Sequence, residues 1–296
     1  MIKLFFSILV LCLTTANVSA INNVSKNTIE FVIPFMPGGG TDFQATSLES
    51  AVLATNPDIK IKKKYFNSCS AALSYAQQVS ASTPTYFFAD VGDLILGDSN
   101  KGARCPPVNT LTAPISPLTK LGSVPLFLCA TPKHSHNLPK LLQQHKIKVG
   151  YATNSAIVAV AKKLNNSQYL VVPYQSSNEL KTAIGSGDIE MFLGANTAIE
   201  YINQGAKCIA ISSAEKIMGL PSLTQFFKKP IPEWNVTTVL FQIGNRSDIT
   251  SQVKKATMNK LFTDALATKG LYNHALVEEN VIDSIIKQEK KLVELD

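Results

Sequence analysis

Short apolar runs alternate along the chain with longer stretches whose apolar residues recur at helical spacing. Strands are expected at residues 29–35, 60–66, 86–89, 126–130, 147–151, 169–172, 189–193, 208–211 and 237–243. Helices are expected at residues 43–55, 70–79, 138–144, 156–164, 178–184 and 198–204, and near the C-terminus at 249–269 and 279–295. This alternation predicts an α/β protein with parallel sheets that bind ligands at the carboxyl ends of their strands.

Residues 1–20 have the pattern of a signal peptide. Lys3 is the only charged residue, residues 4–13 are almost wholly apolar, and small residues lead up to Ala20. The apolar run is too short to span a bilayer, and no later stretch is long and apolar enough to do so. We therefore expect an exported, soluble protein that is cleaved near Ala20.

Length and charge limit the classes of protein that fit. A chain of 296 residues allows two medium-sized lobes. The net charge of +7 favours anionic ligands in a general way. The basic residues are scattered and accompany no nucleic-acid-binding motif, so nucleic acid is not an expected partner. The basic run at residues 60–64 fits a strand with Lys60, Lys62 and Lys64 on its solvated face.

Four cysteines follow the signal peptide, an even number that permits two disulfides in an exported chain. Exported thiols tend to pair within a lobe, which favours Cys69–Cys105 and makes Cys129–Cys208 the second candidate pair. Buried free thiols are the alternative. No CxxC spacing occurs, so neither a zinc site nor another metal site is expected.

The most informative segment is residues 33–42, where a buried strand runs into three glycines and a helix start. Glycines let backbone N–H groups approach a ligand closely, and the helix dipole adds positive potential. Thr41 and Gln44 have the spacing of a capping box. The segment predicts an anion cradle built from main chain. A tight strand-to-helix turn without a ligand is the alternative.

Two further turns have similar chemistry. Residues 194–197 follow a strand, and Thr197 with Glu200 again has capping-box spacing. Residues 152–155 follow another strand, and Ser155 is expected to cap the helix after it. Simple turns and helix caps are the alternative explanation for both.

The sequence gives little support for catalytic chemistry. No GxSxG motif occurs, and no cofactor-binding motif is present. Asp90 and Asp93 end a strand and form a candidate carboxylate pair, although turn formation is an alternative use for them. We expect no catalytic residue and no cofactor, so a binding protein is favoured over a secreted enzyme.

These residues resemble the substrate-binding proteins of tripartite tricarboxylate transporters, also called the Bug family. Residues 33–42 are similar to the opening signature of that family, which ends in three glycines, threonine and aspartate. Weaker similarities follow in order over nearly the whole mature chain, at residues 121–126, 171–176, 191–198, 210–213 and 220–223.

The resemblance implies a periplasmic binding protein type II fold, with two α/β lobes, a hinge and an interlobe cleft. We expect one lobe to comprise residues 27–124 plus 235–296, and the other to comprise residues 125–234. The family implies a small carboxylate ligand, an organic acid or an amino acid, held by a monomer in the periplasm. Membrane transporter subunits are the implied partners. An orphan ligand sensor that acts on a signalling partner is the alternative.

Several pocket loops depart from the family pattern, which leaves the identity of the ligand open. The departures lie at residues 66–70, 90–93 and 152–156 and at Leu193. The expected ligand-binding residues are Pro37, Gly38, Gly39, Gly40, Thr41, Asp42, Asp90, Thr153, Asn154, Ser155, Gly194, Asn196 and Thr197. If Asp90 or Asp93 faces the cleft, a ligand with an ammonium group fits better than a bare dicarboxylate.

Overall fold

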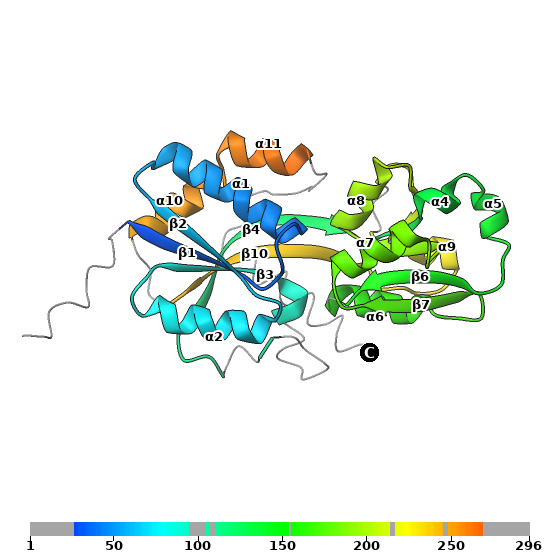
Figure 1. The fold of residues 1–296 in the computed structure, drawn as a ribbon, viewed down its shortest axis with the longest axis horizontal. Coiled ribbons are helices and arrows are strands. Elements are labelled where there is room, and N and C mark those ends of the chain that lie inside the picture. Colours follow the sequence, from blue (N-terminus) through cyan, green and yellow to red (C-terminus); the bar gives the residue numbers. More distant parts are fainter. Residues whose placement is uncertain are drawn as a thin grey trace, which may run out of the picture.

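The computed structural model describes residues 27–94, 105–106, 110–153, 155–213, 217–244 and 248–268. It is a mixed α/β structure with two lobes, each built on a five-stranded sheet (Figure 1). The predicted signal peptide and the expected helix at residues 279–295 lie outside the described residues. None of the helices in the described part of the chain is both long and apolar enough to cross a membrane.

Lobe 1 is built on a sheet with the strand order β2-β1-β3-β10-β4. Its strands are β1 (Thr28–Ile33), β2 (Lys60–Tyr65), β3 (Thr85–Asp90), β4 (Ile115–Pro125) and β10 (Asn235–Ile243). Helices α1 (Gly40–Thr55), α10 (Asp248–Ala256) and α11 (Lys260–Thr268) cover one face, and α2 (Cys69–Ser80) covers the other (Figure 1). Every residue of β1 and β3 is buried, because both faces of these strands are covered.

Lobe 2 is built on a sheet with the strand order β7-β6-β8-β5-β9. Its strands are β5 (Phe127–Ala130), β6 (Ile147–Ala152), β7 (Tyr169–Tyr174), β8 (Met191–Gly194) and β9 (Lys207–Ile211). Its helices are α4 (Pro132–Ser135), α5 (Leu138–Leu141), α6 (Ser155–Leu164), α7 (Ser177–Ser186), α8 (Asn196–Ile202) and α9 (Leu223–Phe227).

The sheets are mixed, so the expectation of wholly parallel sheets is wrong. Strand β10 runs antiparallel to β3 and β4, and β5 runs antiparallel to β8 and β9. Each of these two strands follows a passage of the chain from the other lobe, and it enters its sheet from the end opposite to its neighbours. The other neighbouring strands pair in parallel, as the helical crossovers require.

Most of strand β4 was not predicted, and its place at the sheet edge explains why. It pairs only with β10, and most residues at its start are half-buried rather than alternately buried and exposed. Pro117 lies within it, which an edge strand tolerates because one row of its backbone groups needs no ladder partner. By contrast, the other edge strand, β2, exposes Lys60, Lys62 and Lys64 as its alternation predicts.

Within the described residues, two passages of the chain connect the lobes, and both are tied to Ser212. The Ser212 hydroxyl accepts a hydrogen bond from the Leu126 N–H at 2.8 Å and donates one to the carbonyl of Trp234. The backbone N–H of Trp234 donates to the Ser212 carbonyl at 3.0 Å. Trp234 is buried at this junction and does not line the cleft described below. We propose that the lobes divide here, at residues 124–125 and 234–235.

Candidate ligand-binding site

A cleft of about 760 Å³ is lined by residues of both lobes. Lobe 1 contributes the loop after β1, the start of α1 and the end of β3, and lobe 2 contributes the end of β6 and the starts of α7 and α8. Val236 and Thr238 of the connecting strand β10 also line it. Strand ends and helix starts therefore converge on one space, as expected for ligand binding in an open α/β sheet.

The structure places most of the expected site residues on this cleft. The lining includes Gly38, Gly39, Gly40, Thr41, Asp42, Asp90, Thr153, Gly194, Asn196 and Thr197. Pro37 is exposed and is not among the lining residues. Asn154 lies outside the described residues, and the side chain of Ser155 is not described, so their roles stay predictions. Of the two acidic candidates at the end of β3 and just after it, Asp90 lines the cleft and Asp93 is absent from its described lining.

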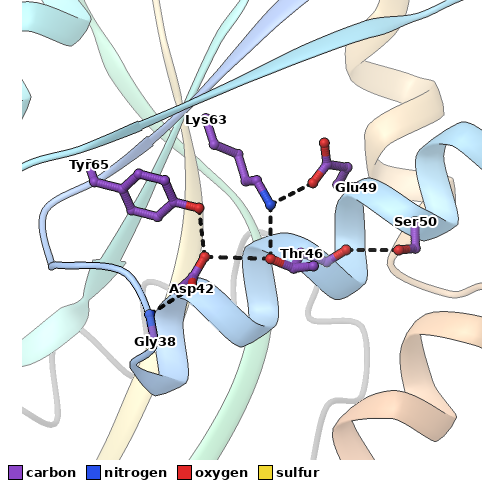
Figure 2. Close-up of polar contacts among 7 residues, drawn as sticks. All are labelled: Gly38, Asp42, Thr46, Glu49, Ser50, Lys63 and Tyr65. Atoms are coloured by element: carbon purple, nitrogen blue, oxygen red, sulfur yellow. Dashed lines mark hydrogen bonds and ion pairs between the residues drawn. The ribbon is translucent and has the colours of Figure 1, made fainter.

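The glycine loop is held in shape by Asp42 (Figure 2). Gly38 has φ +87°, a left-handed conformation that favours glycine, and its N–H donates to the Asp42 carboxylate at 2.8 Å. The hydroxyl of Tyr65 on β2 donates to the other carboxylate oxygen at 2.7 Å. Asp42 therefore acts on the loop: its carboxylate holds Gly38 in place at the start of the residues that line the cleft.

A second layer of contacts supports Asp42 and Tyr65. Thr46, one turn along α1, donates to Asp42 at 3.5 Å and accepts from Lys63 at 3.0 Å. Lys63 also pairs with Glu49 at 2.7 Å. Burial, and then the hydrogen bond to Asp42, raise the pKa of Tyr65 above its ordinary value. The phenol therefore stays protonated and keeps donating to the carboxylate.

The expected capping box of Thr41 and Gln44 is wrong. Helix α1 begins at Gly40 with Gly39 as its N-cap, and no side chain caps it. Thr41 therefore lies inside the first turn. Gln44 is only 1% exposed, on the core face of the helix. An uncapped helix start leaves its first N–H groups without intrahelical acceptors, and these are the groups that bind an anion.

The capping box of Thr197 and Glu200 is also wrong. Helix α8 begins at Asn196 after Ala195, with no side-chain cap, so Thr197 is already helical. Glu200 pairs with Lys181 of α7 at 2.6 Å instead of reaching back to the helix start. The two uncapped helices meet across the cleft, since a Cβ atom added to Gly40 would overlap the side-chain amide of Asn196. Only glycine allows this approach of the lobes.

The start of α7 is a part of the site that sequence reasoning did not assign. Residues 175–181 line the cleft in one continuous stretch. Ser176 caps α7 by accepting from the Glu179 N–H at 3.2 Å, and Glu179 accepts from the Gln175 N–H at 2.8 Å. The sequence shows this capping pattern directly after an expected strand. That signal could have identified residues 175–181 as a further part of the cleft lining.

The charge of the lining differs in sign from that of the whole chain. The charged residues among the described lining are Asp42, Asp90, Glu179, Lys181 and Glu200. Lys181, the only basic one among them, already pairs with Glu200. A chain with net charge +7 therefore encloses a cleft whose described side chains are mainly acidic. An anionic ligand group here depends on backbone N–H groups and helix dipoles rather than on basic side chains.

Asp90 is the acidic residue of the described lining with a buried, unpartnered side-chain oxygen. It ends β3, is 4% exposed, and accepts from the Gly92 N–H through Oδ1 at 2.9 Å. Its Oδ2 is buried and has no hydrogen-bond partner among the described residues. Burial, and then the neighbouring Asp93, raise the pKa of Asp90 well above its ordinary value, and the bond from Gly92 opposes this.

The four cysteines after the predicted signal peptide form two disulfides, one in each lobe. Cys69 at the start of α2 is bonded to Cys105, and Cys129 on β5 is bonded to Cys208 on β9. Both pairings are those that the sequence suggested. The described residues contain no group of three or more His, Cys, Asp or Glu side chains placed to hold a metal ion.

Comparison with known proteins identifies the fold. The sequence matches no protein-family model and no curated protein. Solved structures do match: the periplasmic binding protein BugD has a TM-score of 0.67 at 14% identity, with 90% of this chain and 96% of that chain covered. MatC from Rhodopseudomonas palustris with bound malate has a TM-score of 0.67 at 17% identity, with 89% of this chain and 96% of that chain covered.

A second R. palustris protein, Rpa4515 with adipate, gives the same picture. Its TM-score is 0.68 at 15% identity, with 90% of this chain and 95% of that chain covered. The chain thus has the two-lobed α/β fold of the Bug and TctC periplasmic binding proteins. The resemblance noted in the sequence is confirmed at the level of the fold.

Proposed function

We propose that this protein is an exported, periplasmic solute-binding protein, a divergent member of the Bug family, that captures a small carboxylate. The observation that carries the proposal is the convergence of uncapped helix starts and the glycine loop on one interlobe cleft. Such groups stabilise a carboxylate oxygen without an arginine. Structures with the same fold hold malate and adipate, both small carboxylates.

Binding without turnover fits the side chains of the cleft. Its described lining includes no histidine and no cysteine, so the familiar pairing of a nucleophile with a histidine base is not assembled there. The lobes meet at Gly40 and Asn196, where a bound ligand would hold them together. We propose that subunits of a tripartite tricarboxylate-type membrane transporter recognise this closed, monomeric form.

A thermal-shift screen of the mature chain, residues 21–296, tests the proposal. Organic acids and amino acids are compared at one pH, because a ligand that binds only the folded state raises the melting temperature. We expect at least one small carboxylate to raise it by several degrees. If no carboxylate raises the melting temperature, the proposed function is wrong.

Gly39→Val separates the expected site from any other. A Cβ atom at Gly39 meets only the Met36 carbonyl, at 3.8 Å, and Gly39 has an extended backbone conformation with φ −88°. The variant should therefore fold with a melting temperature close to the native one. The larger side chain should cover the loop N–H groups and abolish the ligand-induced shift. A folded variant with unchanged affinity would place the site elsewhere.

A further inference from the structure

Asp90 stands beside the glycine loop in the sheet. Strands β1 and β3 are parallel neighbours, with Val32 paired with Phe87, so the turns that leave their carboxyl ends lie on the same edge. The turn after β1 contains the glycine loop, and Asp90 is the last residue of β3. Both line the same cleft. A small ligand bound at the loop therefore has Asp90 within its reach.

Among the described residues, the Asp90 carboxyl has no partner of opposite charge. Its Oδ2 is buried without a hydrogen-bond partner among the described residues, and the residue opposite it on β10 is the uncharged Thr238. The one basic side chain in the described lining, Lys181, is held by Glu200. A buried carboxyl in this position costs free energy unless a ligand satisfies it.

We infer that the ligand carries a protonated amine as well as its carboxylate, and that Asp90 accepts a hydrogen bond from that ammonium group. The inference rests on the proposed function and narrows its ligand class to small amino acids. The carboxylate meets the loop N–H groups and the ammonium meets Asp90. A second carboxylate at Asp90 would instead bring two acids together in a buried place, which is unfavourable unless they share a proton.

Ionisation of Asp90 accompanies this contact. The raised pKa keeps its carboxyl protonated to a higher pH in the free protein, and an adjacent ammonium favours the ionised form. The charge of Asp93 acts on Asp90 from outside the described lining, while Asp42, Glu179 and the Lys181–Glu200 pair are the charged groups that line the cleft with Asp90. All of these except Lys181 are acidic. At a pH where the free protein still holds the Asp90 proton, binding of the zwitterion therefore releases it to solvent.

Matched ligand pairs test the inference on the mature chain. Each pair differs by one amino group: succinate and L-aspartate, glutarate and L-glutamate, propionate and L-alanine. We expect the amine member of one pair to bind the native protein more tightly. Asp90→Asn should reduce its affinity by about 30-fold or more, the effect of truncating one partner of a buried charge pair. The affinity of the amine-free member should change far less.

Calorimetry supplies a second measurement that needs no variant. Titrations of the native protein in two buffers of different ionisation enthalpy, at the same pH, give the number of protons released on binding. At a pH between the ordinary pKa of Asp90 and its raised pKa, an ammonium at Asp90 predicts proton release. A protonated Asp90 that donates to a ligand carboxylate predicts no release and tighter binding of the amine-free member.

Asp93→Asn is the matched control. Asp93 is as buried as Asp90, at 4% exposure, and it is not among the described lining of the cleft. This variant should keep the preference for the amine member. It should release fewer protons, because Asp90 loses the neighbouring charge that raises its pKa.

The outcomes separate the two proposals. If amine-free acids bind the native protein as tightly as their amine partners, or if binding releases no proton at any pH tested, the inference about Asp90 is overturned and the carboxylate-binding function stands. If neither member of any pair binds and the wider screen of carboxylates also fails, the proposed function itself is overturned. If Asp90→Asn does not fold, two measurements on the native protein test the inference: its preference for the amine member of each ligand pair, and the number of protons released on binding.

Discussion

Two aspartates at the same edge of the lobe 1 sheet have opposite surroundings. Asp42 accepts hydrogen bonds from the Gly38 N–H and the Tyr65 hydroxyl, so its carboxylate is occupied within the protein (Figure 2). Asp90 has one oxygen bonded to Gly92 and one buried oxygen without a partner in the described structure. The difference teaches that lining a cleft is not sufficient for a role in binding: Asp42 builds the loop, whereas Asp90 has bonding capacity left for a ligand.

Removal of Asp42 should have the largest effect on stability. Asp42→Ala leaves the Gly38 N–H and the Tyr65 hydroxyl without their acceptor, and the free energy of unfolding should fall by about 2 to 3 kcal/mol. Ligand affinity should fall as well, because the loop loses its shape. Chemical denaturation and calorimetry measure the two effects.

Asp248→Ala is the control for that variant. Asp248 is an exposed acidic residue in the first turn of α10, in the same lobe. Its contribution should be limited to the helix dipole, about 0.3 to 1 kcal/mol. Equal losses in the two variants would show that Asp42 has no special role in the loop.

Tyr65→Phe should have an intermediate effect. It removes one of the donors to Asp42 and should cost about 1 to 1.5 kcal/mol of stability, with a measurable loss of ligand affinity. Tyr75→Phe is the matched control, because Tyr75 donates to Glu30 at 2.6 Å in the same lobe and does not line the cleft. It should lose similar stability and keep the native affinity. If both variants bind normally, the support of the loop by Tyr65 is unimportant for binding.

Asp90→Asn should have the smallest effect on the ligand-free protein, with the opposite sign. The folded state holds the Asp90 proton at pH values where the unfolded chain, with a pKa near 3.8, has lost it. Stability therefore falls as the pH rises from that ordinary value toward the raised one. The variant should lack this loss and be more stable than the native protein at neutral pH, with no advantage at pH 3.

Thermal melts of native protein and variant between pH 3 and pH 8 check this prediction. The native curve should decline relative to that of the variant as the pH rises. A difference that is constant with pH would mean that the ionisation of Asp90 does not contribute to it. A variant less stable than the native protein at neutral pH would show that Asp90 already has a partner in the free protein.

Local features were predictable from the sequence because local physics decides them. The buried strands β1 and β3, the amphipathic helices and the lysine-bearing edge strand follow from periodicity alone. The glycine loop could be predicted for the same reason, since a strand, three glycines and a helix start lie within residues 33–42. Strand β4 could not, because a half-buried edge strand with an internal proline has no clear alternation.

Only the tertiary structure decided how the distant parts meet. Strands β10 and β5 run antiparallel to their neighbours. Helices α1 and α8 begin before Thr41 and Thr197, so these residues cannot be the expected caps. Above all, the tertiary structure brought Asp90 to the cleft while Asp93, three residues later, stays outside the described lining. The spacing of apolar residues in the sequence predicts which residues are buried. The direction of a side chain at the end of a strand depends instead on how the two lobes pack.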